Sequence, residues 1–359
     1  MKLLIALAAA LALAVPARAE PPSPGTFVVH AIDVGTGLAV FVEGADFTLL
    51  YDAGSNDDTA RGADKNRVVA YLRAARPDLE RIDHLILSHP HKDHSELMPD
   101  VLAAYQVGNL WDSGSLNPIC SYRALLTGIA EEPGAQYHHA TGALGPHSVS
   151  FKPKNCYGKA LKAATVTIPR SVQITREPVP LGAGAAMTVL HADGTREHEF
   201  NEASVVVRLD LGARRILLPG DAEAGGRRPP TEAPKAGSVE ADLLACCAAA
   251  LRSDILVAGH HGSKTSSRTA FLDAVGAGHY VVSAGPTKYQ TVTLPDKEVV
   301  DEFERRGAVW RTDIDDRACA ANKAKVGPDA DGNPGGCDNL RILIDVAGTI
   351  VPAYERRRD

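Results

Sequence analysis

Three histidines and one aspartate lie within six consecutive residues of the chain. They follow a largely apolar run, residues 82–88, and the segment reads His89-Pro90-His91-Lys92-Asp93-His94. Such a run is typical of a buried β-strand that ends in a loop. Neutral imidazole and carboxylate are ligands that suit zinc, manganese and iron. Four such groups at one strand end therefore predict a metal site.

The motif resembles the metal-binding signature of the metallo-β-lactamase fold. The resemblance implies that His89 and His91 bind one metal ion and that Asp93 and His94 bind a second. Two divalent ions per chain are therefore expected, with zinc as the default. Manganese is the alternative, because a shell with one histidine fewer is richer in carboxylate and water oxygens.

The same resemblance implies further ligands in the second half of the chain. Asp221 follows an apolar run and Gly220, and it is expected to bridge the two ions, since an anion offsets the repulsion between two close dications. His260 and His261 follow the strand-like residues 254–258. We expect His260 to complete the second ion's shell, because the family's final histidine follows a strand and a glycine. His261 would then contact substrate or support the ligands, and the sequence leaves the choice between the two histidines open.

Other polar residues are expected to form hydrogen bonds with these ligands without binding the ions themselves. Asp52 is predicted to orient a ligand histidine, and Asp33 either does the same or caps a turn. Asn201 occupies the place where many members of the fold carry another metal-binding histidine. Asp313 lies where relatives place an acid near the site.

Four further segments resemble the hydrolase domain of the ComEC-type competence proteins. They occur in the order of that family: Asp33-Val34-Gly35-Thr36-Gly37-Leu38-Ala39, Asn201-Glu202-Ala203-Ser204-Val205-Val206-Val207, Gly259-His260-His261-Gly262-Ser263-Lys264-Thr265-Ser266-Ser267 and Arg311-Thr312-Asp313. In that family the domain is considered a nuclease, and full-length members also carry a long membrane channel. No such channel is found in this sequence, so the resemblance implies a free exported relative.

Two segments depart from the competence family. Ser95 and Glu96 follow His94, where the family usually has small residues. The family often has Tyr-Gly-His-Pro in the second half, whereas this chain has Tyr289-Gln290-Thr291-Val292-Thr293-Leu294-Pro295. No histidine in this segment can therefore assist the leaving group.

The favoured function is an exported phosphodiesterase or nuclease that depends on two metal ions. A hydroxide held between the ions would attack phosphorus. Asp93, His261 and Lys264 are the candidate catalytic residues. Ser263, Lys264 and Thr265 either donate hydrogen bonds to the phosphoryl oxygens or cap a helix. The alternatives are hydrolysis of a β-lactam, a lactone or another ester, and a secreted binding protein with a vestigial site.

The first 19 residues predict a signal peptide. Lys2 precedes an apolar run that is too short to cross a bilayer, and Ala17-Arg18-Ala19 is a typical cleavage site. We therefore expect a periplasmic or secreted protein without a membrane span, comprising residues 20–359. The net charge of −6 argues against a generally basic nucleic-acid-binding protein. It does not exclude a nuclease with a nucleic-acid substrate, because metal ions supply local positive charge.

The chain contains six cysteines, and in an exported protein these predict disulfides. Two pairs are expected, each across an irregular segment: Cys319–Cys337, which we favour, and Cys120–Cys156. Cys246 and Cys247 are adjacent in a predicted apolar helix, and we interpret them as buried free thiols.

The elements that must position the candidate ligands alternate between strands and helices. Residues 27–32, 38–43 and 47–52 predict a meander of short strands. Further strands are expected at 82–88, 186–191, 204–211, 215–218, 254–258, 279–283, 309–312 and 340–346, and helices at 66–75, 97–105, 239–251 and 296–306.

Two β-rich halves, each with helices, predict an α/β protein built as an αββα sandwich. We expect one domain over residues 20–359, with irregular inserts near 113–180 and 319–337. A doubly wound parallel fold is the alternative. It is disfavoured because no glycine-rich phosphate loop leads from the first strand into a helix.

Overall fold

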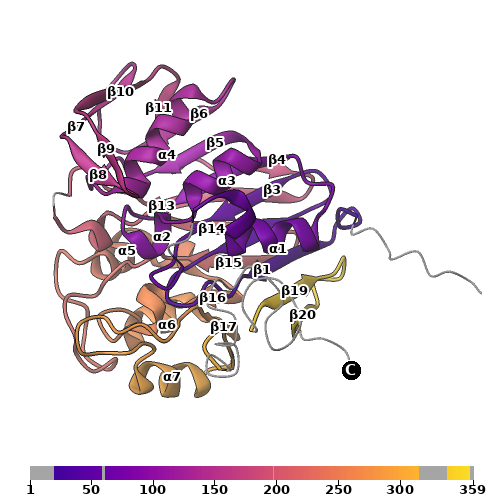
Figure 1. The fold of residues 1–359 in the computed structure, drawn as a ribbon. Helices are drawn as coiled ribbons and strands as arrows, with labels where there is room; N and C mark the ends of the chain where they lie inside the picture. The colour runs from indigo at the N-terminus through magenta and orange to yellow at the C-terminus, as the bar shows by residue number, and fades with distance from the viewer. Residues whose placement is uncertain (1–19, 59–60, 197, 315–337, 356–359) are drawn as a thin grey trace, which may run out of the picture.

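Two large β-sheets form the centre of the computed structural model, which describes residues 20–58, 61–196, 198–314 and 338–355 (Figure 1). Within these ranges, the larger sheet has nine strands, in the order β11 (Ser171–Gln173), β6 (Gln136–His139), β5 (Gln106–Asp112), β4 (Arg81–Leu87), β3 (Thr48–Tyr51), β2 (Val40–Glu43), β1 (Phe27–Ala31), β19 (Leu340–Ile344) and β20 (Ile350–Tyr354). The predicted meander of β1, β2 and β3 is confirmed by their antiparallel pairing.

The second sheet comes from the C-terminal half of the chain. Its seven strands among the described residues are β12 (Val179–Gly182), β13 (Ala185–His191), β14 (Val206–Leu211), β15 (Arg214–Leu218), β16 (Ile255–Val257), β17 (His279–Val282) and β18 (Ala308–Arg311). The strands expected at 204–211 and 215–218 are confirmed as β14 and β15, which pair as an antiparallel hairpin.

Helices cover the outer faces of both sheets (Figure 1). The larger sheet is covered by α1 (Arg67–Ala75), α3 (Met98–Ala104) and α4 (Cys120–Glu131), and the smaller by α5 (Val239–Cys247), α6 (Thr269–Val275) and α7 (Lys297–Glu304). A separate apolar core fills the space between the sheets. The αββα sandwich predicted from the sequence is therefore confirmed.

The alternation of side chains along the strands explains these three apolar layers. In β2, Val40 and Val42 point into the core between the sheets, while Phe41 packs under the helices of the larger sheet. In β3, Leu49 and Leu50 divide in the same way. Successive side chains of a strand point to opposite faces, so strands that are apolar at every position must be covered on both sides.

Parallel pairing brings the polar strand ends together at one edge of each sheet. β3 and β4 are parallel neighbours, so Asp52 and Ser88 leave the larger sheet side by side. In the smaller sheet β15, β16 and β17 are parallel, and they are followed by Asp221, Gly259 and Ser283. The carboxyl ends of parallel strands are the usual location of a site in such folds.

The interpretation of residues 113–180 as irregular was wrong. This segment contains α4, β6, β11 and β12, and two hairpins: β7 (His147–Phe151) with β10 (Ala164–Ile168), and β8 (Lys154–Cys156) with β9 (Lys159–Leu161). The strands are short, and frequent Gly and Pro turns obscure them. Outside this segment, β5, α6, β20 and the short helix Lys92–Ser95 also had no predicted counterpart.

The cysteine predictions have different outcomes. Cys120 is bonded to Cys156, with the two Cα atoms 5.5 Å apart. The interpretation of Cys246 and Cys247 as buried free thiols was wrong, because Cys246 is exposed and the two form a vicinal disulfide. The pair Cys319–Cys337 and the second predicted insert lie outside the described residues.

The predicted signal peptide, residues 1–19, also lies outside the described residues. Within the described ranges, none of the helices combines the length and apolar character that crossing a bilayer requires.

Candidate metal centre

The histidine-aspartate motif lies on the turn between β4 and α2 (Lys92–Ser95). His91 is the N-cap residue of α2, so Asp93 and His94 lie in the first turn of the helix. The backbone of this turn is fixed, since Ala53 N donates to His94 O at 3.0 Å. A Cβ on Gly54 would lie 2.1 Å from the Asp93 carbonyl carbon, so this close approach of two chain segments requires glycine.

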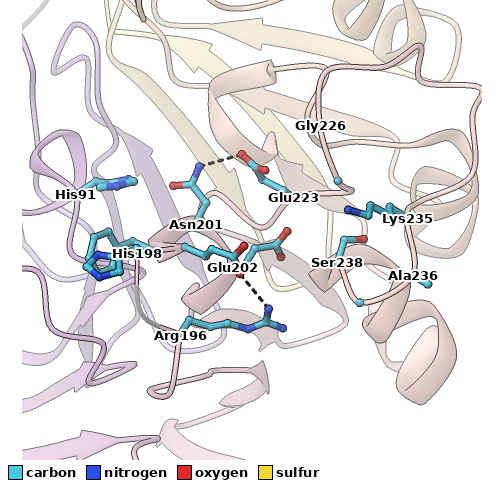
Figure 2. A pocket seen from close by; sticks show the side chains of 14 residues that line it. His91, Arg196, His198, Asn201, Glu202, Glu223, Gly226, Lys235, Ala236 and Ser238 are labelled. Carbon is cyan, nitrogen blue, oxygen red and sulfur yellow. Dashed lines mark hydrogen bonds and ion pairs between the residues drawn. The ribbon is translucent and has the colours of Figure 1, made fainter.

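A cavity of about 460 Å³ opens beside this turn (Figure 2). His91, Asn201 and Glu223 line it together with two cationic side chains, Arg196 and Lys235. Asn201 Nδ2 donates to Glu223 Oε1 at 2.9 Å, and Figure 2 shows the amide oxygen turned away from Glu223. That oxygen is buried and has no hydrogen-bond partner among the described residues. The cavity therefore offers an unused oxygen donor on the wall that also carries His91.

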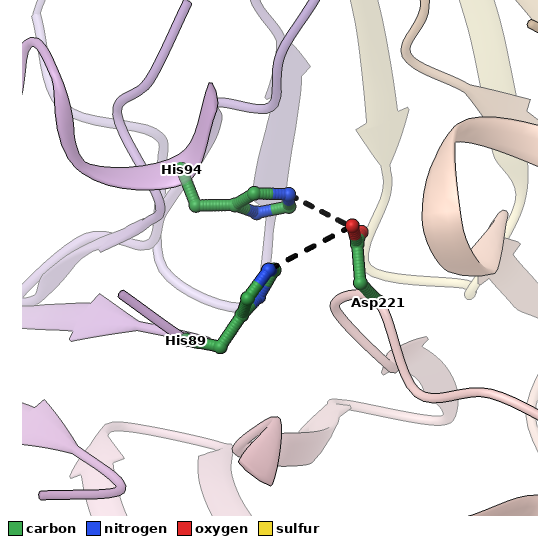
Figure 3. Close-up of side chains that lie close together, drawn as sticks. All are labelled: His89, His94 and Asp221. Atoms are coloured by element: carbon green, nitrogen blue, oxygen red, sulfur yellow. Dashed lines mark ion pairs between the residues drawn. The ribbon is translucent and has the colours of Figure 1, made fainter. Parts of the chain in front are cut away.

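His89, His94 and Asp221 converge at the centre of the site (Figure 3). His89 Nε2 is 3.7 Å from Asp221 Oδ2, and His94 Nε2 is 3.2 Å from Asp221 Oδ1. All three side chains are buried, and one ligand atom from each lies within 4.8 Å of the others. Because protein nitrogen and oxygen ligands bind zinc at about 2.0–2.2 Å, the Asp221 carboxylate is close enough to each histidine to share an ion with it.

A second group of potential ligands adjoins the first. Asp93, His94 and His261 are buried, and one ligand atom from each again lies within 4.8 Å of the others. His261 Nε2 is 3.7 Å from Asp93 Oδ2 and 3.8 Å from Asp221 Oδ1. The structure thus brings His261 into the group of Asp93 and His94, the place that we expected His260 to take.

His260 lies on the other side of the Asp221 carboxylate. Its Nε2 is 3.6 Å from Asp221 Oδ2, the oxygen that also faces His89. His260 and His261 both have left-handed backbone conformations, with φ of 49° and 54°, and this turn sends their side chains to different positions. Asp221 therefore has two imidazoles near each of its oxygens.

Hydrogen bonds on the far side of each ring determine which nitrogen faces the centre. Ser283 O is 2.9 Å from His261 Nδ1 and can only accept, so Nδ1 carries the proton and Nε2 of the neutral ring has a lone pair. Asp52 Oδ2 lies 2.7 Å from His94 Nδ1 and has the same effect. Ser88 donates to both carboxylate oxygens of Asp52 at 2.7 Å.

Three buried atoms at the centre have no hydrogen-bond partner in the part of the chain that the structure describes: His94 Nε2, His261 Nε2 and Asp221 Oδ1. Leaving such atoms buried and unpartnered costs about 1–3 kcal/mol each. The three atoms point toward one another, so a single cation would satisfy all of them. The residues present therefore fit a bound metal ion.

The carboxylates determine the electrostatics of the site. Burial opposes ionisation of Asp93 and Asp221, but the adjacent imidazoles outweigh it and keep both pKa values below the ordinary range. Burial lowers the pKa of His89 and His91, so these rings are neutral near pH 7. Burial opposes the charged form of His94 and His260, but the Asp221 carboxylate outweighs it and raises both pKa values. Two ionised carboxylates among imidazoles form a set of ligands that attracts cations.

Asp33, Asp313 and Lys264, which were also predicted to belong to the site, form hydrogen bonds or ion pairs with other residues. Asp33 caps a turn, since Gly35 N donates to its carboxylate at 2.9 Å, and Asp313 forms two hydrogen bonds with Arg311. Lys264 Nζ is paired with Glu298 at 2.9 Å.

Ser263 and Thr265 are buried beside His260. Thr265 Oγ1 lies 2.7 Å from His260 Nδ1, and Ser263 Oγ accepts from Thr265 N at 3.2 Å. These hydroxyl groups support the turn that carries His260.

Three residues of the site were not predicted from the sequence to belong to it. Tyr289 donates to Asp93 Oδ2 at 2.5 Å and stacks on His261, and Asn56 Nδ2 donates to the same oxygen at 3.2 Å. Glu223 Oε1 is 3.1 Å from His260 Nδ1. Their positions in the sequence could have identified two of them, because Asn56 and Glu223 each follow a strand end that already carried a predicted site residue.

The chain is similar in sequence to known proteins. The model of the family described as the metallo-beta-lactamase superfamily matches residues 32–285. Recombination protein 2 of Haemophilus influenzae is 27% identical over 81% of this chain and 28% of its own length. Competence protein ComA of Neisseria gonorrhoeae is 25% identical over 75% of this chain and 28% of its own length. The chain thus spans less than a third of the relatives it matches.

Solved structures with a similar arrangement share little sequence with this chain. The metallo-beta-lactamase fold protein YhfI from Bacillus subtilis has a TM-score of 0.41 and 12% identity, covering 79% of this chain and 96% of its own. Igni18, a metallo hydrolase from Ignicoccus hospitalis, has a TM-score of 0.43 and 10% identity, covering 80% and 95%.

The hydrogen bond between Asp52 and His94 generates a first prediction. Asp52→Asn is expected to lower zinc affinity about 10- to 100-fold, because the amide orients the ring without its negative charge. Asparagine also tolerates the left-handed φ of 58° at this position. Competition with a chromophoric chelator measures the affinity.

Asp112→Asn is the matched control, since Asp112 is equally buried and accepts hydrogen bonds from Tyr122 and Tyr137 away from the centre. Equal loss of zinc affinity in both variants would show that Asp52 acts through general stability.

Proposed function

The chain belongs to the metallo-beta-lactamase superfamily of metal-dependent hydrolases, and on that premise we propose that it is an exported, dinuclear phosphodiesterase or nuclease. The observation that carries the proposal is the similarity to two proteins named for recombination and competence, which extends over 81% and 75% of this chain. Both names refer to processes that act on DNA. The phosphodiester bond is therefore the favoured target among those that the superfamily's chemistry can hydrolyse.

We propose that His94, Asp93 and His261 bind one ion together with Asp221 Oδ1. Three observations support this assignment. The ligand atoms lie within 3.2–3.8 Å of their neighbours, two ring nitrogens and the Asp221 oxygen lack other partners among the described residues, and Asp52 and Ser283 hold both rings in the required tautomer.

The other ion would be held by His89, His91 and Asp221 Oδ2, with His260 as an additional imidazole. His89 Nε2 and His91 Nδ1 are 2.9 Å apart, and His89 and His260 approach the same Asp221 oxygen at 3.7 and 3.6 Å. Glu223 supports His260 as Asp52 supports His94. His260 thereby compensates for Asn201, which stands where the fold often has a histidine.

Bound in this centre, divalent ions would supply positive charge to the phosphoryl oxygens and lower the pKa of an attacking water. The chain's own groups position the substrate. Lys235 lines the cavity and can contact an anionic diester. Arg196 lies in the same wall but is paired with Asp193 and Glu199. Tyr289 holds its hydroxyl proton beside Asp93, because burial and the Asp93 carboxylate keep its pKa well above the ordinary value. Its phenol thus remains a hydrogen-bond donor at the edge of the centre.

The catalytic proposal predicts a substrate profile. Protein loaded with zinc or manganese should hydrolyse bis(p-nitrophenyl) phosphate and single-stranded DNA, and Asp221→Asn should lower kcat at least about 10³-fold, because both ions lose a shared ligand. Rates are compared with those on nitrocefin and a simple lactone. Faster turnover of either of these than of both phosphodiesters would assign the chain to the ester- or lactam-cleaving class.

Failure to turn over any substrate, together with less than one metal ion per chain, would favour a binding protein with a vestigial site. Asp112→Asn serves as the control for folding, as it does for metal affinity.

The ligand assignment predicts different metal losses for the two adjacent histidines. His261→Ala should remove an ion from the Asp93 side, and His260→Ala should weaken the ion on the His89 side. In cobalt-substituted protein, the two variants should therefore lose different absorption bands, and each should retain about one tightly bound ion. Identical spectra and stoichiometries for the two variants would contradict a division of the histidines between the two ions.

We propose export because a signal peptide is predicted for residues 1–19 and because Cys120 and Cys156 are paired. Mass spectrometry of protein expressed with its leader in a Gram-negative host provides the test. The expected product begins at Glu20, lies in the periplasm and loses two hydrogens of mass for each disulfide. An intact leader on cytoplasmic protein would contradict export.

A further inference from the structure

One segment of this acidic protein contains lysines and arginines but lacks aspartate and glutamate. Between Glu132 and Glu177 the sequence has no acidic residue, whereas the whole chain has a net charge of −6. All of the cationic side chains in this segment are exposed: Lys152, Lys154, Lys159, Lys162, Arg170 and Arg176. The segment includes the hairpins β7–β10 and β8–β9. We call residues 147–176, from the start of β7 to Arg176, the basic insert.

The charges of the basic insert are not neutralised within the protein. Within the described ranges, no ion pair involves its lysines or arginines, whereas cations elsewhere on the surface are commonly paired. Arg208 and Arg215 both pair with Asp210, for example, and Lys297 pairs with Asp301. Unpaired like charges repel one another and attract polyanions, so the insert has the charge pattern of a binding surface.

The exposed face of the β7–β10 hairpin is polar. Val149 and Phe151 pack inward against the helical layer. On the outer face, Ser148 and Ser150 pair with Thr167 and Thr165 across the strands, each with an oxygen–oxygen distance of 2.9 Å. These short hydroxyl side chains allow a polymer backbone to approach closely.

Two lysines lie at one end of this polar face. Arg123 donates to the backbone carbonyls of Lys152 and Lys162, at 3.4 and 2.8 Å, which brings the two residues together. Lys154 and Lys159 extend the positive charge along the β8–β9 hairpin.

The basic insert adjoins the loop that carries the metal ligands. Lys154 Nζ donates to Pro118 O at 2.8 Å, and Asn117 Nδ2 donates to Pro90 O, also at 2.8 Å, between the first two histidines of the motif. The tip of the β8–β9 hairpin makes a second connection. Tyr157 lies under the Arg61 guanidinium at 4.0 Å, and Arg61 forms an ion pair with Glu96.

The disulfide between Cys120 and Cys156 fastens the same hairpin to the start of α4. Figure 1 shows β7 to β10 gathered at one end of the molecule, next to α4 and α2. The basic insert is therefore held in a fixed place beside the metal centre.

We propose that the basic insert binds the phosphate backbone of single-stranded nucleic acid and guides one linkage to the metal centre. This inference rests on the proposed function and names its substrate class, a polynucleotide rather than a small diester. Lysines spaced along two hairpins match a chain of regularly spaced phosphates. Tyr157 is 46% exposed, and the face of its ring that Arg61 does not cover can stack on a base, as aromatic side chains do in single-strand-binding proteins.

A charge-reversal variant of the full chain tests this proposal. Lys152→Glu, Lys159→Glu and Lys162→Glu are combined, and binding of a fluorescein-labelled 30-nucleotide oligo-dT is measured by anisotropy in chelator, so that the DNA stays intact. The association constant should fall at least about tenfold at 0.1 M salt. The slope of its logarithm against the logarithm of salt concentration should become about two units shallower, since each lost phosphate contact contributes about 0.7.

The matched control reverses three exposed cations outside the basic insert, Lys65, Arg73 and Arg252. It should bind oligo-dT within about twofold of the unmodified protein. Unchanged binding by the insert variant would overturn the proposal, and so would an equal loss in the control. Binding to phosphatidylglycerol vesicles without binding to DNA would also overturn it and would identify a membrane surface as the partner.

Hydrolysis of bis(p-nitrophenyl) phosphate separates this inference from the proposed function. The small diester is too short to contact the insert and the metal centre together, so the insert variant should retain its hydrolysis within about twofold while losing activity on long DNA. If the unmodified protein and both variants all fail to hydrolyse the small diester, the proposed function is refuted. The anisotropy data would still decide whether the insert binds DNA. Normal hydrolysis of the small diester with equal DNA cleavage by all proteins would refute the guiding role alone.

Discussion

The contact of the Asp221 carboxylate with four imidazoles is the interaction on which the site depends. His89 and His94 follow a strand of one sheet, whereas Asp221, His260 and His261 follow strands of the other, and all meet within 3.2–3.8 Å. A buried carboxylate is costly unless cationic groups or hydrogen bonds compensate for it. The charge of Asp221 therefore requires ligands from both halves of the fold, and the sandwich must close for the site to exist.

The same principle extends to the layer behind the imidazoles. Asp52, Glu223 and the carbonyl of Ser283 each face the Nδ1 of a different histidine. Each acceptor lies at or just beyond the end of a parallel strand, so sheet topology determines both the position of a ring and its tautomer. Tyr289 and Asn56 perform the equivalent task for Asp93. Asp52 was predicted from the sequence, but the chemistry of the centre also depends on Glu223, Tyr289 and Asn56, which were not.

Local patterns in the sequence were sufficient to predict the sandwich and the ligand cluster from His89 to His94, whereas Asp221 and His260 were expected from the resemblance to a known fold. The apolar runs correspond to strands buried on both faces, and the dense grouping of His89 to His94 has few structural explanations. The two histidines after β16 were harder to assign. Their positions depend on consecutive left-handed residues, a conformation that ordinary propensities disfavour and that no periodicity reveals.

The basic insert was missed for a different reason. Its strands are three to five residues long and carry serine, threonine and lysine on their exposed sides. Packing against α4 stabilises them, and this tertiary contact is absent from any local pattern. Its charge bias, by contrast, can be read directly from the sequence.

The turn at His260 and His261 has a mechanical consequence. The two residues share one peptide plane, and their side chains diverge toward opposite oxygens of Asp221. Neighbouring Cα atoms are held about 3.8 Å apart across a trans peptide, so the positions of the two rings are coupled. Under the proposed assignment, an ion of different radius on one side would shift this peptide unit and strain the coordination of the ion on the other side. The two metal positions would then select their ions as a pair.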